Sequence, residues 1–199
     1  MEMHNKYYLM RHGESLANRR GLIVSHPENA LLSYGLTAKG AEQVMEAALS
    51  TRLGIDTVIV TSDYKRAIDT AEIVHSVLGC TEDLIVEPML RERNFGQLEL
   101  TEHSNYEQVW KHDAAKPEVR HNEVELIDEV LQRGVQSILK LEQAYRGRKI
   151  LMVGHGDVMQ ILLSHFQGIH PRFHRSISSM ANADIRVIAD PSLVKSPAA

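Results

Sequence analysis

Short apolar runs alternate along this chain with segments in which apolar residues recur every three or four positions. The runs are typical of buried strands, and the recurrence is typical of amphipathic helices. The runs predict strands at residues 6–10, 57–61, 84–86 and 149–153. The recurrence predicts helices at residues 14–20, 38–53, 64–78, 104–112, 123–145 and 157–166.

The order of these elements indicates the fold class. Strands and helices follow one another in turn, and residues 182–188 alternate apolar and polar side chains as a half-buried edge strand does. This order favours an α/β fold, a three-layer α/β/α sandwich with a mostly parallel sheet and an antiparallel edge strand. We find no linker or repeat and assign residues 1–199 to a single domain.

Basic side chains gather where three of the predicted strands end. Arg11 and His12 follow the first strand, His155 follows the strand at 149–153, and Arg66 lies in the first turn of the helix after the second strand. Ligands of open α/β sheets bind outside the carboxyl ends of the strands. Two imidazoles and two guanidiniums there predict an anion site, with phosphate as the anion. Taken singly, each histidine would be read as structural and Arg66 as a solvated helix residue.

Four sequence motifs occur in an order that matches one known family. They are Arg11-His12-Gly13-Glu14-Ser15, Thr61-Ser62-Asp63 with Arg66, Leu90-Arg91-Glu92-Arg93-Asn94-Phe95-Gly96, and Gly154-His155-Gly156. Together they resemble the histidine phosphatase superfamily, the phosphoglycerate-mutase-like family whose nucleophile is a histidine. The resemblance runs from about Tyr7 to about Ile188, which is nearly the whole chain.

The resemblance implies a role for each basic residue. His12 would attack phosphorus in line and become a phosphohistidine, which water then cleaves. The Gly13 region would hold the other ring nitrogen by a hydrogen bond. Arg11 and Arg66 would grip the phosphate oxygens, and His155 would add a third cationic or donor group. Because these cations would do the work of a metal ion, no metal and no other cofactor is expected.

Three further residues are candidates for the site. Glu92 matches the family's acid/base position, and a bound phosphate dianion would raise its pKa by repulsion; the alternative is a surface carboxylate paired with Arg91 or Arg93. Asn18, in the helix after His12, would add a neutral hydrogen bond to the phosphate. The loop at 21–35 is a candidate pocket wall. Family members can contribute a phosphate contact from this loop, for which Ser25 is our prediction.

Composition narrows the partners and the compartment. The chain has 43% hydrophobic and 24% charged residues, a net charge of -4 and one cysteine, Cys80. No general basic surface would recruit nucleic acid, and no intrachain disulfide can form. The amino-terminal residues do not resemble a secretory signal, and no apolar run approaches the roughly 18 residues that span a membrane. We therefore expect a soluble cytoplasmic protein, with a homodimer left open as its assembly.

Metal binding is the other common use of clustered histidines. His165, His170 and His174 are close in the sequence, but none has a cysteine or carboxylate in ligand register. We therefore interpret them as structural or surface residues.

Departures from the family pattern bear on the substrate. Leu98-Glu99-Leu100 stands where family phosphatases often have Trp-Glu-Gly, and the segment between Glu92 and the second histidine strand is shorter than in the family's mutases. The prediction is a metal-independent phosphatase acting on a small phosphomonoester. One alternative is a bisphosphoglycerate-dependent phosphoglycerate mutase. Another is a non-catalytic phosphate-binding regulatory protein, against which the presence of both His12 and Glu92 speaks.

Overall fold

One five-stranded sheet forms the centre of the computed structural model, which describes residues 3–189. The strands are β1 (Lys6–Arg11), β2 (Val58–Thr61), β3 (Ile85–Val86), β4 (Lys149–Gly154) and β5 (Ile185–Ala189), and their order in the sheet is β3-β2-β4-β1-β5. The first four are parallel and β5 runs antiparallel to β1 at the edge. The mostly parallel sheet with an antiparallel edge strand is therefore confirmed.

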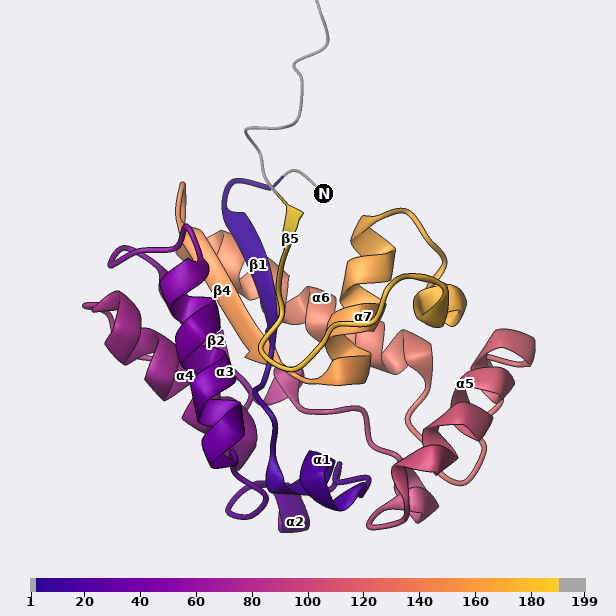
Figure 1. Cartoon of the computed structure of the whole chain (residues 1–199). Coiled ribbons are helices and arrows are strands. Elements are labelled where there is room, and N and C mark those ends of the chain that lie inside the picture. Colours follow the sequence, from indigo (N-terminus) through magenta and orange to yellow (C-terminus); the bar gives the residue numbers. More distant parts are fainter. Residues whose placement is uncertain (1–2, 190–199) are drawn as a thin grey trace, which may run out of the picture.

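Two layers of helices cover the sheet (Figure 1). Helices α3 (Ala38–Ser50) and α4 (Lys65–Leu78) lie on one face, and α6 (Ile127–Ala144) and α7 (Gly156–Phe166) lie on the other. Successive side chains of a strand point to opposite faces, so Tyr7 and Leu9 of β1 pack toward α6 and α7, while Tyr8 and Met10 pack toward α3 and α4. All four side chains are buried, which is why the strand reads as a continuous apolar run.

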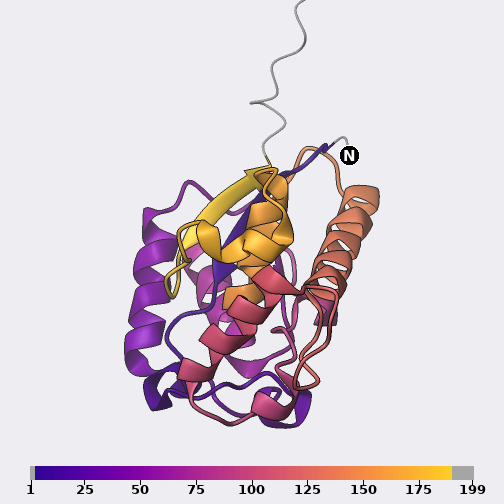
Figure 2. The same cartoon turned by 90° about the vertical axis from the view of Figure 1, so that its right-hand side faces the viewer.

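The chain leaves β1 and β4, which are neighbours, toward opposite faces of the sheet. After β1 it continues to α3, and after β4 it continues to α7 on the other face. Such a reversal between adjacent parallel strands opens a crevice at their carboxyl ends. Helices α1 (Leu16–Arg20) and α2 (Pro27–Ala30) lie below this end of β1 in Figure 1, and α5 (Tyr106–Ala115) lies beside it, toward the viewer in Figure 2. The short 3₁₀ helices between these elements are η1 (Pro88–Leu90), η2 (Gly96–Leu98), η3 (His103–Asn105) and η4 (Pro171–Ser176).

Several elements begin later than the sequence predicts, each for a local reason. Helix α1 starts at Leu16 because Ser15 caps it, its hydroxyl accepting a hydrogen bond from the backbone N–H of Asn18. The helix predicted at 123–145 starts at Ile127, since Asn122 and Glu123 have φ angles of 51° and 60°. The strand predicted at 182–188 starts at Ile185, because the preceding residues form a turn in which Ala183 has a φ of 61°.

The loop predicted at 21–35 is also not wholly irregular, since it contains the short helix α2. Pro27 at its first position has a φ suited to a helix start and lacks the N–H that would have no partner there. Within residues 3–189, no helix has the length and the apolar character needed to cross a membrane.

Candidate active site

His12 stands at the carboxyl end of β1 and is only 3% exposed. Its Nδ1 lies 2.7 Å from the carbonyl oxygen of Gly13, which can only accept, so the ring carries its proton on Nδ1 and keeps a lone pair on Nε2. The Nε of Arg66 donates to that lone pair over 3.1 Å. Burial, with the charges of Arg66 and Arg11, holds the pKa of His12 well below its usual value. The imidazole is therefore neutral, with Nε2 as its basic nitrogen. The contact that the family resemblance implied with the Gly13 region is present.

Two glycines fix the backbone that carries His12. A Cβ on Gly40 would lie 2.0 Å from the carbonyl oxygen of Glu14, and a Cβ on Gly13 would lie 2.5 Å from the carbonyl oxygen of Gly40. The loop after β1 therefore rests directly on the first turn of α3, whose cap is Thr37. Any larger residue would push the loop, and the His12 ring with it, away from the sheet.

Arg11 and Arg66 each present a buried N–H group that has no partner among residues 3–189. Arg66 is held by its Nη2, which donates to the carbonyl oxygen of Val24 over 2.9 Å, and its Nη1 is unpaired. Arg11 is held by its Nη1, which donates to the carbonyl oxygen of Met180 over 2.7 Å, and its Nε is unpaired. Burial lowers the pKa of both guanidiniums, while Glu92 acts in the opposite direction. Buried donors that lack protein partners mark a place for an anion.

His155 directly follows β4 and packs against His12, although it is not among the residues that line the cavity described below. Its ring is fully buried and its centroid lies 5.3 Å from that of His12. Its Nε2 lies 2.9 Å from the hydroxyl of Ser62, and its Nδ1 has no partner in the described residues. Burial, with the charges of Arg66 and His12, puts the pKa of His155 well below its usual value. Of the two roles that the sequence left open, the neutral donor fits this ring.

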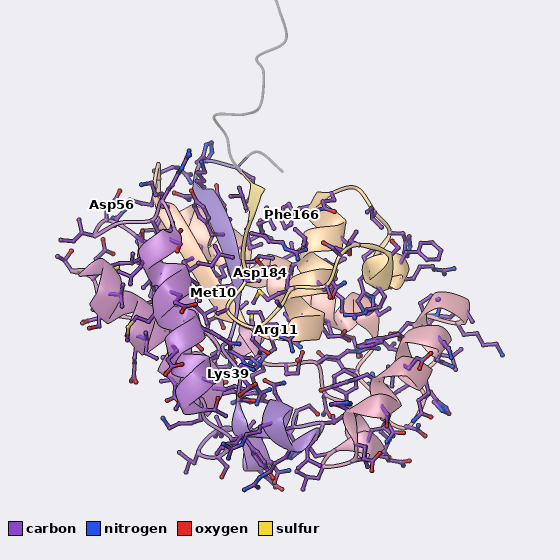
Figure 3. The ribbon with its side chains drawn as sticks, in the orientation of Figure 1. Met10, Arg11, Lys39, Asp56, Phe166 and Asp184 are labelled. Atoms are coloured by element: carbon purple, nitrogen blue, oxygen red, sulfur yellow. The ribbon has the colours of Figure 1, made fainter. Side chains whose placement is uncertain are left out.

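A cavity of about 600 Å³ opens beside these groups. Its lining includes Arg11, His12, Arg66 and Glu92. Figure 3 shows Met10 within the sheet and Arg11 at the end of β1, so consecutive residues of this strand belong to the core and to the site. Other lining residues come from segments distant in sequence, namely Leu22, Val24, Tyr106, Trp110, Gln160, Arg175 and Met180. This volume is in the range of pockets for small molecules.

Glu92 lines the cavity and is not a surface ion pair. Arg91 instead binds Asp63 over 2.9 and 2.5 Å, and Arg93 binds Asp113 and Asp157. Among the described residues, Glu92 accepts a hydrogen bond only from the backbone N–H of Arg93, at 2.9 Å. Burial raises the pKa of Glu92, and the charge of Asp157 raises it further, while Arg66 and Arg11 oppose this. From the sequence, a bound phosphate was the expected cause of a raised pKa at Glu92. Burial and Asp157 raise this pKa without any phosphate.

A buried ionic network that no local sequence pattern signals lies beside Glu92. Arg93 is 2% exposed and holds Asp113 of α5 over 2.7 and 2.8 Å and Asp157 of α7 over 3.2 Å. Asp157 also accepts from the indole N–H of Trp110 at 2.9 Å and lies 3.3 Å from Nε2 of His174. Burial acts to raise the pKa of Asp157, but the charges of His174 and Arg93 hold it well below its usual value. The network fastens α5 to α7 over the cavity.

Of the two remaining candidates, Asn18 lines the cavity and Ser25 does not. Asn18 lines the cavity, and its Oδ1 accepts from the backbone N–H and the hydroxyl of Ser15, so its Nδ2 is the atom that can donate to a ligand. Ser25 is not brought to the site. Its hydroxyl donates to Glu99 over 2.7 Å and accepts from the backbone N–H of Phe95, and the side chain is buried outside the cavity lining. The loop contributes the apolar wall of Leu22 and Val24 instead.

The three carboxyl-terminal histidines lie apart from one another. His165 and His170 are exposed, and His174 is buried against Asp157 and the carbonyl oxygen of Pro171. Across residues 3–189 no three His, Cys, Asp or Glu side chains converge as metal ligands would.

Comparison with known proteins gives the family of this geometry. Residues 7–190 match the model of the histidine phosphatase superfamily, branch 1. The chain belongs to the histidine phosphatase superfamily. A relative from Escherichia fergusonii, named "Probable phosphoglycerate mutase GpmB", is 34% identical over 171 residues, covering 81% of this chain and 74% of that protein. The resemblance that the four motifs carried is thus confirmed, and the enzyme class expected from it, phosphoric monoester hydrolase, agrees with the family.

Solved structures share the fold of this superfamily member. Bacillus stearothermophilus YhfR aligns with a TM-score of 0.77 at 25% identity, covering 92% of this chain and 90% of that one. The mycobacterial glucosyl-3-phosphoglycerate phosphatase in complex with VO3 aligns with a TM-score of 0.75 at 22% identity, covering 92% and 91%. At this identity the second likeness is one of fold.

Proposed function

We propose that this protein is a metal-independent phosphatase that hydrolyses a small phosphomonoester through a phosphohistidine on His12. The observation that carries the proposal is the neutral His12 ring, held through Nδ1 by Gly13 and beside the unpaired donors of Arg11 and Arg66. A nucleophile with a free lone pair, next to donors without partners, suits attack on a phosphate.

In the first step, Nε2 of His12 attacks phosphorus in line with the leaving oxygen. Arg11 and Arg66 hold the equatorial oxygens, His155 donates to one of them, and Asn18 can donate through Nδ2. The phosphorus–oxygen bond to the alcohol breaks as the nitrogen–phosphorus bond forms. Charge that develops on the phosphoryl oxygens is stabilised by donors already in place, where most of the rate enhancement is expected.

Glu92 supplies the proton for the leaving oxygen. Its raised pKa keeps the carboxyl protonated closer to neutral pH than an ordinary glutamate. Having given up the proton, the carboxylate takes one from water, and the hydroxide formed attacks the phosphohistidine. Phosphate leaves, His12 is again neutral, and Glu92 is again protonated.

A second candidate is a phosphoglycerate mutase, which the name of the 34% identical relative favours. A mutase would return the phosphoryl group to an acceptor alcohol in place of water. A phosphate-binding protein without turnover is the third candidate. It would need neither a nucleophile nor an acid, and the raised pKa of Glu92 beside a nucleophilic His12 supports an enzyme over it.

One assay separates the three candidates. Phosphate release is measured with an aryl phosphate, and then with 3-phosphoglycerate in the presence and absence of 2,3-bisphosphoglycerate, with His12→Ala as the control. We expect release from the aryl ester without any cofactor and without inhibition by a chelator. Formation of 2-phosphoglycerate only with the bisphosphate would establish the mutase, and phosphate binding without turnover would establish the binding protein. A small phosphorylated substrate fits the cytoplasmic location expected from the sequence.

A further inference from the structure

The cavity lining contains a third arginine that the mechanism does not use. Arg175 lies on η4 and lines the same cavity as Arg11 and Arg66. Its guanidinium carbon lies 3.8 Å from the centroid of the Trp110 ring, and its Nη1 donates to Oε1 of Gln160 over 2.5 Å. These two contacts place the guanidinium before any substrate binds.

No carboxylate within residues 3–189 forms an ion pair with Arg175, in contrast to Arg91 and Arg93. Arg91 is paired with Asp63, and Arg93 is paired with Asp113 and Asp157. Arg175 has one nitrogen on the amide oxygen of Gln160 and is half-buried, so the rest of its planar fork of donors can meet a ligand. Guanidinium forks of this kind bind carboxylates and phosphates in bidentate geometry.

The charges around the cavity exceed what one phosphate requires. Its lining holds three guanidiniums. Of its carboxyl groups, Glu92 has a pKa raised by burial, and Asp157 is already shared between Arg93, Trp110 and His174. Glu107 at the rim pairs with Lys111 over 2.8 Å. The charge of Arg175 also acts on Arg11, since burial lowers the pKa of Arg11 and Arg175 lowers it further. The whole chain carries a net charge of -4, so this positive surplus is local.

We propose that Arg175 binds a second oxyanion on the alcohol part of the substrate, and thereby selects phosphomonoesters that carry a carboxylate or a second phosphate. The inference rests on the proposed phosphatase function and names its substrate class. Arg11 and Arg66 hold the phosphoryl group that is transferred, and Arg175 holds the far end of the leaving group. Trp110 serves as the support of Arg175, because the guanidinium already covers its ring.

The test uses pairs of substrates that differ only in this charge. Phosphate esters of ω-hydroxy carboxylic acids with two to five carbons are compared with the esters of the matching carboxamides, and kcat/KM is measured for each. A charge-assisted bond at a half-buried site leads us to expect a preference of about tenfold for the carboxylate at the best chain length. Propane-1,3-diol bisphosphate and monophosphate form a parallel pair that distinguishes a second phosphate from a carboxylate.

Variants at two arginines of η4 attribute the preference. Arg175→Gln removes the charge, and Arg175→Met removes it while keeping an apolar contact with Trp110, so one of them remains informative if the other folds poorly. Both should bring the ratio of kcat/KM for the carboxylate to that for the carboxamide to about one, and Arg175→Lys should keep part of the preference. Arg172→Gln is the matched control, since Arg172 stacks on Phe173 outside the cavity lining and should leave the ratio unchanged.

The outcomes are distinct. A wild-type ratio near one for both the carboxylate and the bisphosphate pairs would overturn the inference, as would a preference that survives Arg175→Gln and Arg175→Met. If the carboxamide esters are hydrolysed, the proposed function stands whatever the ratio. If no ester of either series is hydrolysed, the proposed function fails and the selectivity assigned to Arg175 fails with it.

Discussion

The Nε of Arg66 lies 3.1 Å from Nε2 of His12, so the guanidinium occupies the lone pair that would attack phosphorus. The same side chain is anchored at its other end by Val24 and has a buried Nη1 without a partner in the described residues. A phosphate that enters would draw the donors of Arg66 onto its oxygens and release the lone pair of His12. Binding of the substrate would thus activate the nucleophile.

This relationship predicts the effect of removing Arg66. Arg66→Ala should lower kcat for an aryl phosphate about 10²- to 10³-fold, the range seen when one donor to a transition state is lost. Arg91→Ala is the control, because Arg91 binds Asp63 and does not line the cavity, and it should stay within a few-fold of the wild type. Equal values of kcat for the wild type and a folded Arg66→Ala variant would show that Arg66 does not stabilise the transferred phosphate.

Asp157 predicts a shift in the pH profile. A raised pKa keeps the proton on Glu92 to higher pH, so kcat/KM for an alkyl phosphate should hold up to that pKa and fall above it. Asp157→Asn removes a negative charge near Glu92 and leaves Arg93 less neutralised. Both changes favour the Glu92 carboxylate and lower its pKa, so the alkaline limb should move to lower pH. Glu107→Gln, an exposed rim position paired with Lys111, should not move it. An unmoved limb in Asp157→Asn would show that Asp157 does not act on Glu92.

The general acid role of Glu92 predicts a dependence on the leaving group. Glu92→Gln should strongly slow hydrolysis of an alkyl phosphate, whose alkoxide needs a proton to leave. The phosphorylation step with an activated aryl phosphate should suffer far less, because its phenolate leaves unaided. Burst-phase kinetics are required, since Glu92 also activates water in the second step. An equal loss in the burst for both substrates would mean that Glu92 orders the pocket and that another group donates the proton.

The buried network predicts a large stability difference between neighbouring arginines. Arg93→Met leaves the buried carboxylate of Asp113 without its cation and Asp157 with His174 alone, which should lower the free energy of unfolding by about 3–5 kcal/mol. Arg91→Met removes a partly exposed pair and should cost about 1 kcal/mol or less. Urea unfolding of both variants measures the difference. Similar losses in the free energy of unfolding for the two variants would show that the ion pairs of Arg93 stabilise the fold no more than the pair of Arg91.

The basic groups whose location could be predicted from sequence are those that stand at a strand end. Arg11, His12 and His155 follow apolar strands directly, so the parallel sheet alone brings them to one edge. Arg66 follows a strand by five residues and needed the family resemblance, because its position within a helix is also that of a solvated arginine. The strands themselves were readable because both faces of the sheet are covered, which makes the runs continuously apolar.

The groups that were missed depend on contacts between distant segments. Ser25 was assigned to phosphate, but its hydroxyl donates to Glu99, 74 residues away, which no local pattern signals. Asp157 directly follows His155-Gly156, yet its partners Arg93 and His174 come from other segments. Gly40 looks like an ordinary helix residue, and only the packing of Glu14 against it reveals why no larger side chain fits.

The phosphohistidine is the central claim and can be tested directly. The wild-type protein is mixed with an aryl phosphate labelled on phosphorus, quenched within the first turnover, and analysed for protein-bound phosphate beside His12→Ala. We predict labelled phosphate that is stable in base and labile in acid, located on the peptide containing His12, and absent from the variant. Loss of turnover in His12→Ala without loss of fold should accompany it, because the side chain stands beyond the last core residue of β1. Substantial hydrolysis by His12→Ala, or a wild type that turns over without ever carrying phosphate on His12, would contradict the account.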